Sequence, residues 1–571
     1  MPQNQRKVPY SGKKKKDQLI KKRRAKMSQK FLNGASDGET TEDNELTSGK
    51  LMEQPLNRGG RHKNVNRYNL QFYQESKKEL EQMKVEGYNQ LDGVKPKMRE
   101  MDAHYFDGYD FPIRPNWSYD MDKNILNLNE NRYFKEYVEN LQKFHKEGNN
   151  ELSLFELNLE TWRQLWRVLE FSDILLIIVD VRYASLMFPP SLYNYIVQTL
   201  KKHAILVLNK VDLVEPDVVV AWRHYFLEKY PQLPVVLFAS YSNTSMKGSA
   251  RRSVCYKLCM EGVYNIYKEC QKIVNSELDL TSWEQKIEED MDTGNLIDDK
   301  MIVQTIETTE EISDDSVSKP YQKFSNGKLT VGCIGFPNVG KSSLINALKG
   351  KKVVSVSRTP GHTKHFQTIY LTNVVVLCDC PGLVFPSATP KHLQVLLGSY
   401  PISQLQVPYR SLKFLGEHLH IPNLLKLHLP EDFDVWSPAA LADAWALKRG
   451  FLTAKAARPD RYRAANHLLR MCLAGQNNII LQFYPPGYND AKDFWQQHAE
   501  VEKVKRYQNI PIEDEHLMSN NEDTSSINSE SGESEETTSS NDETNADEED
   551  EEMPHASTSK RSNAFALLDQ D

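Results

Sequence analysis

Large apolar residues recur along the middle of the chain in two distinct patterns. Between residues 159 and 169 they are spaced three and four positions apart, which is the period of an amphipathic helix. Short continuous apolar runs follow, and such runs predict strands that are buried on both faces of a parallel sheet. The expected strands cover residues 174–179, 204–208, 235–238, 329–334 and 374–377.

The segments between the expected strands leave room for helices, so the predicted fold class is α/β with a doubly wound sheet. A helical region is expected at 388–510, where Ser437 and Pro438 are typical of a helix start and Gly450 of a helix end. Residues 61–155 combine aromatic clusters with charges, and we expect an N-terminal extension there that lies on the α/β domain.

Charge divides the chain into a nearly neutral body and two polar ends. Residues 1–30 hold 12 Lys and Arg against one acid, whereas residues 511–553 hold 17 Asp and Glu and no Lys or Arg. Such segments bury too little apolar surface to fold, so we expect a basic disordered arm at 1–60 and an acidic disordered tail at 511–571. Residues 276–318 carry 14 acids against two lysines, which predicts a solvated linker inserted into the α/β domain.

The basic arm bears on where the protein acts. Its runs Lys13–Lys16 and Lys21–Arg24 suit a nuclear or nucleolar localisation signal or a binding site for RNA phosphates, and a solvated tail is the plain alternative. No run reaches 18 apolar residues, so no membrane partner is expected. Seven scattered cysteines suit reduced thiols. We therefore expect a protein of the nucleus or nucleolus and the cytoplasm.

The strongest chemical motif directly follows an expected strand. The segment from Gly335 to Ser342, here called the phosphate loop, fits G-x-x-x-x-G-K-[ST], and the helical pattern that this motif requires begins at Ser343. In such a motif, backbone N–H groups and the positive end of the helix hold phosphates, Lys341 supplies charge to the β- and γ-phosphates, and Ser342 binds Mg²⁺. The expected nucleotide contacts are Gly335, Asn338, Val339, Gly340, Lys341, Ser342 and Ser343.

A second motif, Asn209-Lys210-Val-Asp212, predicts which base is bound. The Asp212 carboxylate can accept two parallel hydrogen bonds from the N1–H and 2-amino groups of guanine, a donor pair that adenine lacks. Asn209 suits the base edge and the loop backbone, and the stem of Lys210 suits the face of the ring. Ala239 and Ser240 come at the end of another expected strand, where a backbone N–H suits a contact with guanine O6. A strand end without any role in binding is an equally good interpretation.

Two further segments complete the expected phosphate and metal site. In Asp379-Cys-Pro-Gly382, Asp379 can hold Mg²⁺ and the Gly382 amide can sense the γ-phosphate, although an ordinary Pro-Gly turn is the alternative. A switch threonine that completes Mg²⁺ coordination is expected at Thr363, and Thr359 is the other candidate for this role. A flexible turn without a role in metal binding is the alternative interpretation of this segment. The expected catalytic residues are Lys341, Thr363 and Gly382.

The order of the motifs is unusual. The base-binding Lys210 precedes Lys341 by 131 residues, whereas the phosphate loop comes first in ordinary GTPases. Domain termini often lie close together, so a permuted order can keep the fold. The helical region then directly follows Gly382, which predicts that the γ-phosphate repositions it. Leu383 stands where a water-orienting Gln is usual, so we expect slow intrinsic hydrolysis that a partner accelerates.

With these motifs in this order, the chain resembles the circularly permuted GTPases of the YlqF/YawG type. The resemblance implies a circularly permuted Ras-like P-loop G domain over 156–387 that binds GTP or GDP with Mg²⁺. It also implies that Asn338 can coordinate K⁺ and that ribosomal RNA or pre-ribosomal particles are partners. A GTP-dependent scaffold that binds proteins with negligible turnover is the alternative function. If the protein hydrolyses GTP rather than acting as a scaffold, we expect an unidentified partner to activate it.

Overall fold

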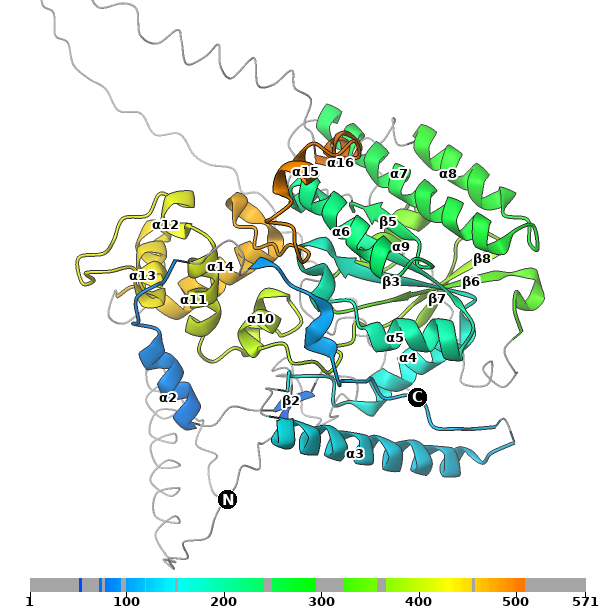
Figure 1. Ribbon diagram of the computed structural model, residues 1–571, viewed down its shortest axis with the longest axis horizontal. Helices are drawn as coiled ribbons and strands as arrows, with labels where there is room; N and C mark the ends of the chain where they lie inside the picture. The colour runs from blue at the N-terminus through cyan, green and yellow to red at the C-terminus, as the bar shows by residue number, and fades with distance from the viewer. Residues whose placement is uncertain are drawn as a thin grey trace, which may run out of the picture. The chain divides into compact units, whose positions relative to one another are not determined.

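In the computed structural model of this protein, the described residues are 51–53, 71–73, 77–93, 99–118, 120–148, 152–240, 249–293, 322–356, 366–453 and 458–508. Their centre is a sheet in the strand order β5-β4-β3-β6-β8-β7, with helices on both sides of it (Figure 1). Neighbouring strands are parallel except β7 and β8, which are antiparallel. The strands are β3 Ile174–Asp180, β4 His203–Asn209, β5 Val235–Phe238, β6 Leu329–Ile334, β7 Gln367–Tyr370 and β8 Val375–Asp379.

The α/β fold class and the five strands expected from the apolar runs are confirmed. The sheet is mixed rather than wholly parallel, because β7 adds an antiparallel edge that the sequence pattern did not predict. β7 has only four residues, and its last residue, Tyr370, is exposed. An edge strand of this length needs no continuous apolar run, so the hydrophobic pattern contains too little signal to reveal it.

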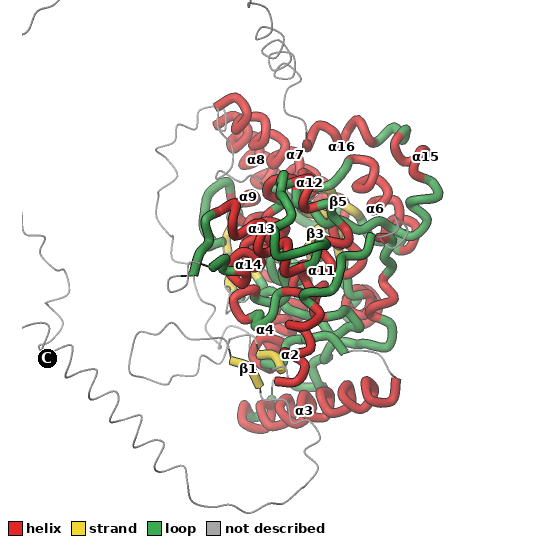
Figure 2. Tube along the Cα trace, turned by 90° about the vertical axis from the view of Figure 1, so that its left-hand side faces the viewer, coloured by secondary structure: helices red, strands yellow, loops and turns green. Residues whose placement is uncertain are grey.

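Helices cover both faces of the sheet. The predicted amphipathic helix is α4, which packs against β6 through buried residues that include Trp162 and Leu165. On the other side, α7 packs against β5 and α9. The view in Figure 2, turned by 90°, again has α4 and α7 on opposite sides of the sheet. These helices are α4 Leu159–Phe171, α5 Pro190–Asn194, α6 Pro216–Lys229, α7 Ser249–Val274 and α9 Lys341–Lys349.

The acidic segment that follows α7 in the chain is not, over its helical part, the solvated linker that its composition predicts. Residues Thr281–Thr293 form the helix α8, which packs against α7. Trp283 and Ile287 lie one turn apart and are buried, while the acidic side chains occupy other positions of the helix. The prediction is wrong here because mean charge conceals a buried stripe of a few large apolar residues. Residues 294–318 of the predicted linker lie outside the described residues.

The C-terminal part of the described chain is helical, as predicted. The side-chain oxygen of Ser437 caps the start of α13, and Gly450 ends this helix with a φ of 66°. Both residues therefore have the roles that the sequence indicates. The helices are α10 Lys391–Leu396, α11 Tyr409–His418, α12 Ile421–Leu424, α13 Pro438–Arg449, α14 Arg461–Ala474, α15 Lys492–Gln496 and α16 Val501–Gln508.

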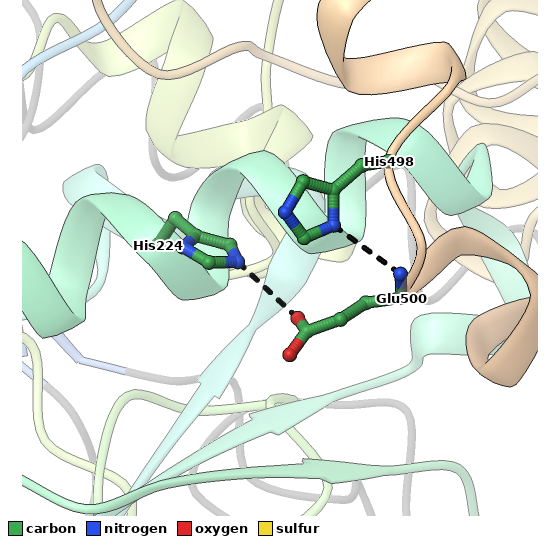
Figure 3. A group of neighbouring side chains, drawn as sticks. All are labelled: His224, His498 and Glu500. Carbon is green, nitrogen blue, oxygen red and sulfur yellow. Dashed lines mark hydrogen bonds and ion pairs between the residues drawn. The ribbon is translucent and has the colours of Figure 1, made fainter.

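The last two of these helices return to the α/β domain, where a polar cluster joins them to α6 (Figure 3). Glu500 accepts a hydrogen bond from Arg223 at 2.7 Å and lies 3.3 Å from Nε2 of His224. The backbone N–H of Glu500 donates to Nδ1 of His498 at 3.2 Å. Because these side chains satisfy one another, we assign the cluster a structural role.

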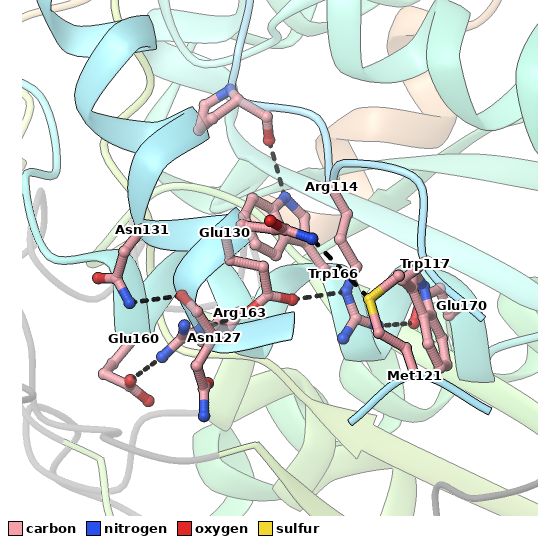
Figure 4. A network of polar contacts seen from close by, with 12 residues as sticks. Arg114, Trp117, Met121, Asn127, Glu130, Asn131, Glu160, Arg163, Trp166 and Glu170 are labelled. Carbon is pink, nitrogen blue, oxygen red and sulfur yellow. Dashed lines mark hydrogen bonds and ion pairs between the residues drawn. The ribbon is translucent and has the colours of Figure 1, made fainter. Parts of the chain in front are cut away.

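The N-terminal extension packs against the α/β domain (Figure 4). Arg114 pairs with Glu130 of α3 at 3.0 Å and with Glu170 of α4 at 2.7 Å. The indole N–H of Trp166 donates to the carbonyl of Pro112 at 2.8 Å. The extension therefore lies on the main domain, as expected. Its elements are β2 Gln71–Tyr73, α2 Lys77–Glu86 and α3 Lys123–Gly148.

One short strand corrects the prediction of a disordered arm. Leu51–Glu53 forms β1, which pairs antiparallel with β2, so the prediction is wrong for these three residues. The remainder of 1–60 and all of 511–571 lie outside the described residues. Among the described helices, none combines the length and the apolar character that crossing a membrane requires.

Candidate functional site

The predicted site residues that the structure describes meet at one edge of the sheet. Asn209 ends β4, Asp379 ends β8, and the phosphate loop begins directly after β6. These strands are parallel, so their carboxyl ends lie on the same edge, where ligands of open α/β sheets bind. The permuted motif order therefore still produces a single site.

The backbone of the phosphate loop requires its two glycines. Gly335 has a φ of 150°, and a Cβ there would lie 2.4 Å from the carbonyl oxygen of Ile178. Gly340 has a φ of 101°, and a Cβ there would lie 2.2 Å from Nδ2 of Asn209. The helix α9 begins at the next residue, with Ser342 and Ser343 in its first turn. The loop thus leads into a helix N-terminus, which suits an anion.

Lys341 lies inside this loop with 7% of its surface exposed. Its ammonium group donates to the carbonyl oxygens of Gly335 at 3.1 Å and Phe336 at 2.6 Å. Burial lowers the pKa of Lys341, although Asp379 opposes this effect. A buried ammonium group beside an anion-binding backbone is suited to phosphate oxygens.

Asp379 is fully buried at the end of β8. Within the described residues, neither of its carboxylate oxygens has a hydrogen-bond partner. Burial raises the pKa of Asp379 to about 6, against the opposing charge of Lys341. A buried carboxylate without partners is costly unless a ligand compensates it, and together with the Ser342 hydroxyl it fits the oxygen ligands of Mg²⁺. The predicted threonine Thr363 and its rival Thr359 lie outside the described residues.

The segment after Asp379 lies directly on the phosphate loop. A Cβ on Gly382 would lie 2.8 Å from Cα of Pro337 and 3.1 Å from Nζ of Lys341. The backbone N–H of Leu383 donates to the carbonyl of Gly335 at 3.3 Å, and its side chain is buried. The structure thus brings Gly382 beside Lys341, as expected, and places an apolar side chain next to it.

The guanine loop, residues 209–213, is joined to the phosphate loop. Asn209 donates from Nδ2 to the carbonyl of Val339 at 2.6 Å and accepts the N–H of Lys210 at 2.8 Å. Lys210 adopts a φ of 63° and donates to the carbonyl of Asn338 at 2.8 Å. Asp212 is exposed at the surface, although the atoms packed around its carboxyl group raise the pKa of that group.

Ala239 and Ser240 lie beside the guanine loop. β5 pairs in parallel with β4, and Phe238 is the register partner of Asn209. The two following residues therefore extend past Asn209 at the edge where the base is expected. Their backbone contact with guanine O6 stays a prediction.

Asn338 contacts the helical region as well as the guanine loop. Its side-chain amide donates to the carbonyl of Gly398 at 2.9 Å, and its φ is 60°. The proposed K⁺ coordination by Asn338 stays a prediction, in which the amide oxygen would be the ligand.

Two buried charged residues at the site, Asp180 and Arg182, were not predicted from the sequence. Asp180 ends β3 and is the register partner of Asn209. It pairs with both Arg182 and Lys210. The signal available in the sequence was an Asp at the end of an apolar run, the same position that Asp379 occupies.

The sheet, the phosphate loop and the guanine loop together define a GTPase domain whose elements run in permuted order. Residues 330–400 match a family model described as 50S ribosome-binding GTPase. The chain is 44% identical to guanine nucleotide-binding protein-like 1 of Rattus norvegicus, over 80% of this chain and 79% of the relative. The corresponding human protein is 43% identical over the same shares of the two chains.

The chain therefore belongs to the guanine nucleotide-binding protein-like 1 family of circularly permuted GTPases. It is also 31% identical to Large subunit GTPase 1 homolog of Mus musculus, over 69% of each chain. Among solved structures, GNP-bound YlqF from T. maritima is 18% identical and covers 57% of this chain and 98% of its own, with a TM-score of 0.33.

Proposed function

We propose that this GTPase is a guanine-nucleotide switch with slow intrinsic hydrolysis that acts in the assembly of ribosomes or other ribonucleoprotein particles. The observation that carries the slow rate is the position of Leu383. Its backbone is held against Gly335 of the phosphate loop, and its side chain is buried. Attack on the γ-phosphate requires a positioned water, and a leucine side chain cannot orient one by hydrogen bonding.

The residues in place would bind and orient the nucleotide. Lys341 would hold the β- and γ-phosphates, and Gly382 would present its N–H to the γ-phosphate. Ser342 and Asp379 would hold Mg²⁺, which neutralises charge on the phosphates when bound. A K⁺ ion held by Asn338, or a residue from an activating partner, would then complete the site for hydrolysis.

The assembly role rests on chemistry and on relatives. The basic arm would bind RNA phosphates or serve as a nuclear or nucleolar localisation signal, with part of the protein in the cytoplasm. One relative is named Large subunit GTPase 1 homolog, and the matching family model is described as ribosome-binding. We therefore propose ribosomal RNA or pre-ribosomal particles as partners.

The second candidate function is a GTP-dependent scaffold that binds proteins with negligible turnover. The same buried Leu383 favours it if no partner completes the site. Sedimentation of the tagged protein through a sucrose gradient separates the two candidates. We expect co-migration with pre-ribosomal particles in the presence of GTP, and loss of it in a Lys341→Ala variant. Migration only with small protein complexes would favour the scaffold.

A further inference from the structure

Two buried charges next to the guanine loop have no part in the phosphate chemistry. Asp180 ends β3, and Arg182 follows in the short helix η3, Val181–Leu186. Each is 1% exposed. Arg182 donates from Nε to Oδ1 of Asp180 at 3.0 Å and from Nη2 to Oδ2 at 2.8 Å. A bidentate pair of this kind fixes the direction of the carboxylate as well as its distance.

The same carboxylate holds the base-binding lysine. Lys210 donates from Nζ to Oδ2 of Asp180 at 2.7 Å. Burial disfavours the charged form of Asp180, but Arg182 and Lys210 outweigh it and hold the pKa well below its usual range. Burial lowers the pKa of Lys210, and Asp180 opposes this. Asp180 therefore favours the charged form of Lys210 and, together with the carbonyl of Asn338, holds its ammonium group in place.

The outer edge of the Arg182 guanidinium faces the helical region. It donates from Nη1 to the carbonyl of Cys472 at 3.0 Å and from Nη2 to that of Leu473 at 3.2 Å. These carbonyls belong to the last turn of α14, where the helix dipole favours a cation. Gly475 ends α14 with a φ of 64°, and a Cβ there would lie 3.0 Å from Leu213 of the guanine loop.

We propose that Arg182 is a positioning residue that sets Lys210 through Asp180 and couples guanine binding to the end of α14. The inference rests on guanine binding at residues 209–212, which is part of the proposed function. Ordering of Lys210 by the base orders the end of α14, and the reverse holds by linkage. GDP and GTP share the base, so this coupling is independent of the γ-phosphate, unlike the repositioning expected through Gly382.

Hydrogen exchange in the unaltered full-length protein tests the coupling directly. The amides of 468–478 are compared without nucleotide and with GDP, a non-hydrolysable GTP analogue or ATP. We expect several-fold slower exchange with both guanine nucleotides and no change with ATP. Protection of the phosphate loop by GDP without any change in 468–478 would overturn the coupling and leave nucleotide binding intact. Absence of protection everywhere would overturn guanine binding itself.

Variants of Arg182 test the positioning role through nucleotide affinity. Arg182→Met should weaken GDP and GTP binding by the same factor, about tenfold or more, and abolish the protection of 468–478. Arg182→Lys should restore part of the affinity, because it keeps the charge but not the bidentate geometry. Arg470→Met, which replaces an exposed arginine of α14, is the matched control and should change nothing.

Two results would contradict the positioning role. One is a folded Arg182 variant that binds GDP as the unaltered protein does. The other is a variant that weakens GTP binding alone, which would assign the effect to the γ-phosphate. Should Arg182→Met fail to fold, as thermal unfolding would reveal, Arg182→Lys carries the same test, with reduced affinity for both nucleotides as the expected result.

Discussion

Gly340 stands where the phosphate loop touches the guanine loop. Its φ of 101° is unfavourable for any residue with a side chain, and an added Cβ would lie 2.2 Å from Nδ2 of Asn209. That same Nδ2 donates to the carbonyl of Val339. The contact therefore sets the backbone for phosphate and the side chain for the base at once.

Gly340→Ala should weaken binding of GDP and GTP by at least about 100-fold, or about 2.7 kcal/mol. The added methyl group must displace Asn209 or shift the loop, and either change disturbs the site. Titration with a fluorescent guanine nucleotide measures the effect. Gly327→Ala is the matched control, because Gly327 has a φ of 67° and nothing within 4 Å of an added Cβ. Equal affinity of the two variants would contradict this assignment.

Leu383 is the residue on which the expected hydrolysis rate depends. Leu383→Gln should raise single-turnover GTP hydrolysis by about tenfold, because the amide can orient the attacking water. Leu383→Met keeps an apolar side chain of similar size and should leave the rate unchanged. A Gln variant that binds GTP normally and hydrolyses it at the unaltered rate would show that Leu383 does not determine the rate.

At the scale of elements, α8 shows how a charged segment can be part of the core. Trp283 is 0% exposed, and its ring centroid lies 5.5 Å from that of Tyr267 in α7. Trp283→Ala should lower the free energy of unfolding by about 3–5 kcal/mol, as for other buried aromatic residues. Urea unfolding measures the change. Glu288→Ala, at an exposed position of the same helix, should cost less than about 0.5 kcal/mol. Similar midpoints for both variants would show that α8 does not pack on the core.

The C-terminal end of α4 is capped by a buried lysine, Lys202, which directly precedes β4. Nζ of Lys202 donates to the carbonyls of Leu169 at 2.9 Å, Glu170 at 2.6 Å and Ser172 at 2.8 Å. Burial lowers the pKa of Lys202 to about 8, against Asp173 and Glu170. Between about pH 8 and the ordinary lysine value near 10.4, the unfolded chain binds the proton and the folded chain does not. The free energy of unfolding therefore rises with pH across this window.

Lys202→Met should remove this rise. The difference in unfolding free energy between the unaltered protein and the variant should grow by up to about 1.4 kcal/mol per pH unit above pH 8. Lys201→Met, its exposed neighbour, is the control and should keep the rise. Parallel pH profiles for the unaltered protein and Lys202→Met would contradict the lowered pKa.

Sequence patterns predicted the elements that carry continuous apolar runs and the loops that carry fixed motifs. β3, β6 and β8 are buried along their length and β4 along all but its first residue, whereas β5 alternates half-buried and buried apolar positions, so each strand leaves a clear apolar run in the sequence. β7 and α8 escaped because an edge strand and a charged amphipathic helix bury few residues. The pairing of Asp180 with Arg182 and Lys210 escaped because it depends on how strands and loops meet in space.

At the scale of the whole molecule, the candidate nucleotide site lies between the sheet and the helical region. The phosphate loop contacts this region through Asn338 and Gly398, and Arg182, which lies beside the guanine loop, contacts it at the end of α14. The segment after Gly382 leads into it along the chain. Three separate connections therefore place the helical region where it can respond to the bound nucleotide and present that state to a partner.

GTP turnover by the full-length protein, in KCl and in NaCl, with and without ribosomal particles, tests the proposed function most directly. We predict slow turnover by the protein alone, because the side chain of Leu383 cannot orient the attacking water. We predict stimulation by K⁺ and by particles, because each would complete the site for hydrolysis. Tight GTP binding with negligible turnover under every condition would contradict the assembly GTPase and favour the scaffold.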